Sequence, residues 1–196
     1  MSLWNMYKST LIVSSRSVTF KAGKRVKISH LKLTSPFQGS DARPLFLYNH
    51  LSGHNMIIKK EIMQWASPFP NDIYYDWWLA VVACANGRIS TLNKILVYHR
   101  IHDKNASSNK KEYFHEVQLR VISSLLKVPN LPATTLDFGR QLLYYFTDLR
   151  NKKYSFLLFI LLVRHARSIF FYKRRVLPYF SYLKQSWRIS CKNYIR

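Results

Sequence analysis

The stretch that decides the fold runs from Ile73 to Gly87 and reads Ile-Tyr-Tyr-Asp-Trp-Trp-Leu-Ala-Val-Val-Ala-Cys-Ala-Asn-Gly. Its side chains are apolar on nearly every side, which predicts a buried helix over residues 73–86. Gly87 suits the position just after the last turn of such a helix. Because a helix that is apolar all round must be covered on all sides, this chain needs a packed core around it.

Working outward, β-type runs lie on both sides of this helix. The predicted strands are residues 10–13 with a continuation over 17–20, residues 56–58 as a buried strand, and residues 88–91 and 94–99 as two strands. Short helices are predicted over 44–51 and 60–66, with Asn71 or Asp72 as the N-cap of the long one. After residue 110 the pattern turns helical, over 110–127, 134–150, 154–172 and 178–190. The fold class is therefore α/β: a mixed-sheet core followed by an α-helical region.

The charge of the chain is extreme and unevenly distributed. With 196 residues, 48% of them hydrophobic, the chain is expected to fold, and its formal net charge is +22. Every carboxylate lies between Asp41 and Asp148, so the bases that follow Asp148 have no acid to offset them. Such a field attracts polyanions, either nucleic acid or an anionic membrane surface.

Aliphatic and aromatic residues interleave with these bases, which favours the membrane over nucleic acid. The apolar run over residues 156–163 is far shorter than the ~20 residues that a spanning helix needs. We therefore expect the region to lie on the bilayer without crossing it. Cys84 and Cys191 form no disulfide or zinc pattern, so a reducing compartment is expected. The predicted location is cytoplasmic, peripheral on the inner face of the cell membrane.

Asp76 and Gly53 are the residues whose chemistry stands out. A carboxylate at the mouth of an apolar helix is suited to take a proton from a hydroxyl, yet acids also favour the first turn of any helix for structural reasons. Ser52-Gly53-His54-Asn55 precedes the strand at 56–58, and its glycine permits close approach of backbone to a ligand. An ordinary loop-to-strand turn explains the same residues.

The order of motifs adds a family resemblance. Pro68-Phe69-Pro70, then Asp76-Trp77-Trp78, then Arg100-x-His102-x-x-Asn105 follow the Ser52-Gly53 turn. Together they resemble the acceptor-binding half of a bacterial family-2 glycosyltransferase of the GT-A type. The resemblance implies that Asp76 is the catalytic base. It also implies that the site is formed by the remaining motif residues, namely Gly53, His54, Trp77, Trp78, Arg100, His102 and Asn105.

The implied reaction is inverting transfer of a sugar from a nucleotide-diphosphate sugar to a growing surface glycan of lipopolysaccharide or capsule type. Arg100 and His102 would contact the diphosphate, and His102 would also ligate the family's divalent metal, Mg²⁺ or Mn²⁺. The usual metal-binding Asp is absent, since Ser15 or its neighbour stands where it belongs. For Arg100 and His102, a plain polar strand edge is the structural alternative.

The resemblance sets the expected domain organisation. Residues 1–107 are expected to form a partial, N-terminally truncated GT-A core, and residues 108–196 a helical, basic, membrane-peripheral region. The donor-binding half would then come from a separate polypeptide, and the acceptor would be a glycan or a lipid-linked glycan. Two alternatives stay open: a non-catalytic remnant or partner subunit that binds glycan or membrane, and a basic nucleic-acid-binding protein.

Overall fold

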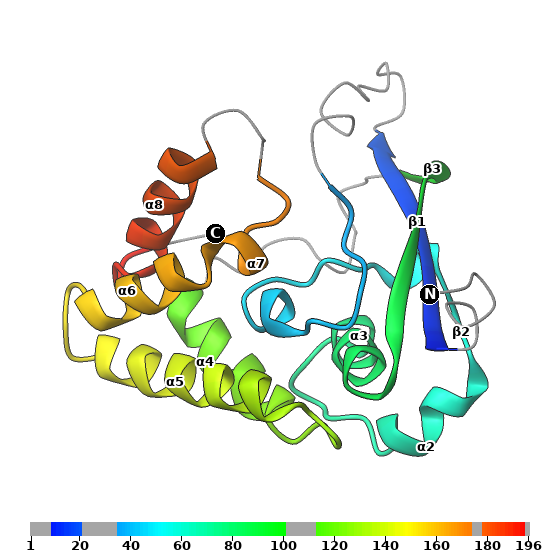
Figure 1. Ribbon diagram of the computed structural model, residues 1–196, viewed down its shortest axis with the longest axis horizontal. Coiled ribbons are helices and arrows are strands. Elements are labelled where there is room, and N and C mark those ends of the chain that lie inside the picture. Colours follow the sequence, from blue (N-terminus) through cyan, green and yellow to red (C-terminus); the bar gives the residue numbers. More distant parts are fainter. Residues whose placement is uncertain (1–8, 21–34, 101–112, 174–177, 195–196) are drawn as a thin grey trace.

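The computed structural model describes residues 9–20, 35–100, 113–173 and 178–194 (Figure 1). The fold is mixed α/β, as predicted, with a three-stranded mixed sheet in the order β2-β1-β3. β1 (Thr10–Phe20) is the central strand; it pairs antiparallel with β2 (Met56–Ile58) and parallel with β3 (Arg88–Arg100). Figure 1 shows this sheet on one side of the molecule and helices α4 to α8 on the other.

β3 is one strand where the sequence predicted two. Ser15 pairs with Leu92 and Arg16 with Ile95, so Asn93 and Lys94 form a bulge that the ladder passes over. The side chain of Asn93 also accepts a hydrogen bond from Arg16 Nε at 2.5 Å. The break predicted at residues 92–93 is therefore a bulge within one strand.

β2 exists as predicted, but it is not buried. It is the outer strand of the described sheet, and the Ile57 side chain is 77% exposed. An edge strand has solvent on one side, so its outward residue needs no apolar cover.

The helix α3 (Tyr75–Asn86) covers the sheet and matches the predicted element within two residues. Its residues 77–84 are all buried. Shorter turns lead to it: the 3-10 helices η2 (Arg43–Phe46), η3 (Gly53–Asn55) and η4 (Lys60–Ile62), then α2 (Met63–Ala66). Only the first turn of the helix predicted over 44–51 forms. Gly87 follows the last residue of α3. A Cβ at position 87 would lie 2.6 Å from the Ser9 carbonyl oxygen.

The second half of the chain forms α4 (Phe114–Leu125), α5 (Ala133–Leu149), α6 (Phe156–Arg164), α7 (Ala166–Ile169) and α8 (Pro178–Ile189). The single helix predicted over 154–172 is interrupted at His165, whose φ of −99° and ψ of 7° leave the helical region. Its ring packs on Phe138 and its Nδ1 lies 3.2 Å from Arg43 Nη1. In the described part of the chain, none of the helices has both the length and the apolar character needed to cross a bilayer.

One hydrophobic cluster joins the two halves. It runs from Leu11 and Ile12 in β1 through α3 to Phe146 and Ile169 in the helical half. η2 lies between them and contacts α3, α4, α5 and α7. Buried amides fix the junction: Gln118 Nε2 donates to the Leu47 carbonyl at 3.0 Å, and Gln185 Nε2 to Tyr48 Oη at 2.7 Å. Two residues of the helical half therefore fix the segment that follows η2, at Leu47 and Tyr48.

Candidate functional site

Asp76 lies in the first turn of α3 and is half-buried. Its Oδ1 accepts hydrogen bonds from Asn49 Nδ2 at 3.0 Å and from the Trp77 backbone N–H at 2.8 Å. Its Oδ2 accepts one from the Gly53 backbone N–H at 3.0 Å. A carboxylate has about four lone-pair positions, so Oδ2 keeps one for a further donor. The residue therefore both ties the helix start to two loops and retains an acceptor.

The predicted N-cap of α3 is wrong. Tyr74 holds that position with no side-chain cap, and Asp72 instead accepts a hydrogen bond from Ser124 Oγ at 2.8 Å. The bond from the Trp77 N–H to Asp76 takes over part of the capping.

The Ser52–Asn55 turn carries two contacts that organise this region. Gly53 donates to Asp76, and Asn55 Nδ2 donates to the Ser15 carbonyl at 2.8 Å. The turn therefore links the start of α3 to the middle of β1. Gly53 is also covered closely, because a Cβ there would lie 1.7 Å from Tyr75 Oη.

His54, on the same turn, stacks on His99 of β3, with ring centroids 4.7 Å apart and planes 11° apart. The pKa of His54 is lowered, first by desolvation and then by His99, while the Asp76 carboxylate opposes the shift. A neutral imidazole can both donate and accept hydrogen bonds, so His54 suits a polyhydroxyl ligand. His99 is a residue that the sequence did not single out, since only the sheet pairing brings it to the turn.

The remaining predicted site residues are placed apart from this cluster. Trp77 and Trp78 are 4% and 5% exposed, and their indole N–H groups donate to the Leu45 and Ala66 carbonyls. They fix α3 from the core side. Arg100 is exposed at the last position of β3, next to His99, so the two side chains leave opposite faces of the strand. His102 and Asn105 lie outside the described residues.

A cavity of about 180 Å³ adjoins the turn on its β1 side. Its lining is mainly polar and includes Ser15, Ser17, Ser52, Asn55 and Thr91. Asn55 Oδ1 is buried there without a hydrogen-bond partner among the described residues. At ~30 Å³ for each water, the cavity has room for several waters or a small polar group. Its hydroxyls and its unpaired amide oxygen are groups that recognise hydroxyl-rich ligands.

The described residues do not fit the divalent metal that the resemblance implies. No group of three or more His, Cys, Asp or Glu within them could hold a metal ion. The β1 positions beside the cavity are Ser14, Ser15, Arg16 and Ser17, which include no carboxylate. We therefore assign no step to Mg²⁺ or Mn²⁺.

No family model matches this chain, and no curated protein or solved structure matches it significantly.

Proposed function

We propose that the cluster of Asp76, Gly53, His54 and His99 is the acceptor side of an inverting glycosyltransferase site. The observation that carries the proposal is the hydrogen bond from the Gly53 N–H to Asp76 Oδ2. It joins two motifs of the resemblance that lie 23 residues apart. The polar cavity behind the same turn supplies the hydroxyl-binding groups that a sugar requires.

In the proposed reaction an acceptor hydroxyl attacks the anomeric carbon of a nucleotide-diphosphate sugar. The new carbon–oxygen bond forms as the bond to the diphosphate oxygen breaks, and the nucleoside diphosphate leaves with the bonding electron pair. Asp76 Oδ2 takes the hydroxyl proton through its remaining lone pair. The His54–His99 pair would orient the acceptor through hydrogen bonds. The donor half of the site is proposed to come from a separate polypeptide.

The experiment follows both binding and turnover with the full chain. NMR spectra with a panel of saccharides and nucleotide sugars would show shifts of the Gly53 and Asn55 signals on binding. Release of nucleoside diphosphate would report transfer. Asp76→Asn is expected to lower turnover by about 10²–10⁴-fold with saccharide binding kept. Asp72→Asn removes an acid from the same loop region and is expected to change neither.

Three outcomes separate the alternatives. Saccharide binding without turnover of any donor favours the non-catalytic glycan-binding protein. Equal turnover in the wild type and Asp76→Asn removes the base assignment. No binding of any saccharide or nucleotide sugar overturns the proposal as a whole.

A further inference from the structure

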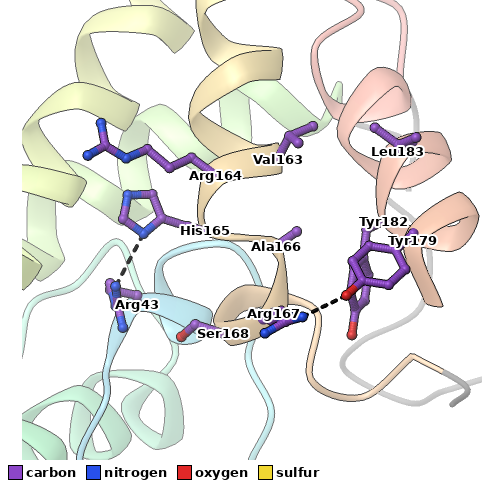
Figure 2. Close-up of a pocket in the computed structure, with 10 residues that line it drawn as sticks. All are labelled: Arg43, Val163, Arg164, His165, Ala166, Arg167, Ser168, Tyr179, Tyr182 and Leu183. Atoms are coloured by element: carbon purple, nitrogen blue, oxygen red, sulfur yellow. Dashed lines mark hydrogen bonds between the residues drawn. The ribbon is translucent and has the colours of Figure 1, made fainter.

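A groove of about 470 Å³ is lined by residues of α6, α7 and α8 in the helical half and by Arg43. It shares no lining residue with the cavity beside Ser52. Figure 2 shows Val163 and Leu183 on opposite sides of it, and Tyr179 and Tyr182 close together on α8. Ala166 and these four residues give the groove an apolar and aromatic lining, on a scale suited to a small ligand or a lipid segment.

The groove also carries unmatched positive charge. Arg164 and Arg167 flank Ala166, and Arg167 Nη2 donates to Tyr179 Oη at 2.6 Å. Among the described residues, neither arginine forms an ion pair with a carboxylate. A guanidinium group beside an apolar lining, as Arg167 is, is suited to a phosphate oxygen on an amphiphilic ligand.

The nearest acid does not cancel these charges. Asp41 is paired with Arg43 at 2.7 Å and also accepts a hydrogen bond from Ser168 Oγ at 2.5 Å. His165 feels the remaining positive field: its pKa is lowered by burial first, then by Arg43 and Arg164, with Asp41 opposing. Arg164 and Arg167 therefore carry the positive charges of the groove that are available to an anionic ligand.

The helices α6 and α8, which line the groove, also carry exposed apolar side chains. Phe180 is 72% exposed, Phe156 60%, Trp187 55% and Leu157 54%. The two helices pack on each other, so these residues come from adjoining elements. α8 also bears the exposed bases Lys184 and Arg188. Large exposed apolar groups beside bases are the composition of helices that lie in a membrane interface.

We propose that the α6–α8 face docks on an anionic phospholipid bilayer. The groove receives a lipid phosphate at Arg167, Arg164 adds positive charge at its rim, and Phe180, Leu157 and their neighbours enter the boundary between headgroups and acyl chains. Charge complementarity selects a bilayer with anionic headgroups, and the apolar lining distinguishes it from nucleic acid, whose backbone offers nothing to bury there. The proposal stands on residues separate from those of the proposed transferase site.

Vesicle flotation with the full chain tests it. The probes are phosphatidylcholine vesicles with and without about 30% phosphatidylglycerol, at about 0.1 M salt. Binding is expected with the anionic vesicles. Each arginine near such a surface contributes about a tenfold factor at most, so Arg164→Gln/Arg167→Gln is expected to weaken binding by roughly thirtyfold. Lys60→Gln/Lys94→Gln removes equal charge from exposed positions on the other half and is expected to have a minor effect.

A second pair of variants tests the apolar contact. Phe180→Ser/Leu157→Ser is expected to weaken vesicle binding at least tenfold, because burying the two side chains drives insertion. Ile57→Ser, an equally exposed position on β2, is the matched control. Equal binding to neutral and anionic vesicles, or equal losses in the variants and their controls, would overturn the proposal. So would competition of vesicle binding by inorganic phosphate at millimolar concentration, because the groove would then hold free phosphate. Asp76→Asn is expected to leave vesicle binding unchanged, so the two proposals fail separately.

Discussion

The Gly53 backbone N–H donates to Asp76 Oδ2 at 3.0 Å, directly beneath the phenol of Tyr75. A side chain at position 53 would collide with the Tyr75 ring, because a Cβ there would lie 1.7 Å from Tyr75 Oη. Because the Tyr75 side chain is 56% exposed, a residue larger than glycine at position 53 requires this ring to move aside.

Gly53→Ala is expected to displace the Tyr75 ring, and so to lower the free energy of unfolding by about 1 kcal/mol at most, because this ring is exposed and can move. The cost is expected to fall in a Tyr75→Ala background, because the clashing atoms are then gone. Urea unfolding of the four proteins of this cycle measures the coupling between the two residues. Equal costs in both backgrounds would show that Tyr75 does not restrict the turn.

Trp77 and Trp78 contribute to the site through the position of α3. Trp78→Phe is expected to cost about 2 kcal/mol, because it leaves the buried Ala66 carbonyl unpaired and removes ring atoms from the core. Trp187→Phe on the exposed face of α8 is the control and should change stability by less than about 0.5 kcal/mol. If Trp78→Phe instead kept full stability and lost saccharide binding, the residue would line the site directly.

The sequence correctly predicted the elements that are determined by their own local residues. The helix at 75–86 is apolar all round and can only be buried, so its location and its relation to Asp76 followed from the pattern. The contact between the Ser52–Asn55 turn and Asp76 could be expected only from the resemblance.

The errors come from long-range contacts that no local pattern contains. The bulge at Asn93 depends on Arg16, 77 residues away. The break at His165 depends on Arg43 and Phe138, which hold its side chain outside a continuous helix. His99 joins the candidate site for the same reason, through sheet pairing that carries it to His54.

Gly139 tests the junction between the halves of the molecule. Alanine normally stabilises a helix interior by about 1 kcal/mol relative to glycine. In α5, however, a Cβ at this position would lie 2.5 Å from Phe46 Cε1 and 2.9 Å from Leu126 Cδ2. Gly139→Ala is therefore expected to lower the free energy of unfolding by about 1–2 kcal/mol.

The matched experiment for Gly139 replaces the opposing ring. The Phe46→Leu/Gly139→Ala protein is expected to be more stable than the sum of the two single changes predicts, as measured by thermal or urea unfolding. A gain in stability for Gly139→Ala alone would mean that η2 and α5 are not packed at this point.

The stability of the fold is expected to fall as the pH drops below about 6.5. His115 is 2% exposed, and burial lowers its pKa, helped by the charges of Lys192 and Arg150. The Glu116 carboxylate and a hydrogen bond with the Lys192 backbone oppose this shift. The unfolded chain takes up a proton near pH 6.5 that the folded chain resists, so each such histidine removes up to 1.36 kcal/mol per pH unit until its folded pKa is reached. His54 and His165 act in the same direction.

Urea unfolding between pH 7.5 and 5 measures this dependence. His115→Gln keeps a side-chain donor without the titration and is expected to reduce the slope, with the largest difference at the acid end. Asp41 affects stability in a separate, more acidic pH range. Burial raises its pKa, but hydrogen bonds from Arg43 and Ser168 outweigh burial and lower the pKa from 3.8. Its stabilising contribution is present above that value and lost only below it, so it adds no slope in the range measured. An unchanged slope in His115→Gln would mean that this histidine takes up its proton equally in the folded and unfolded chains.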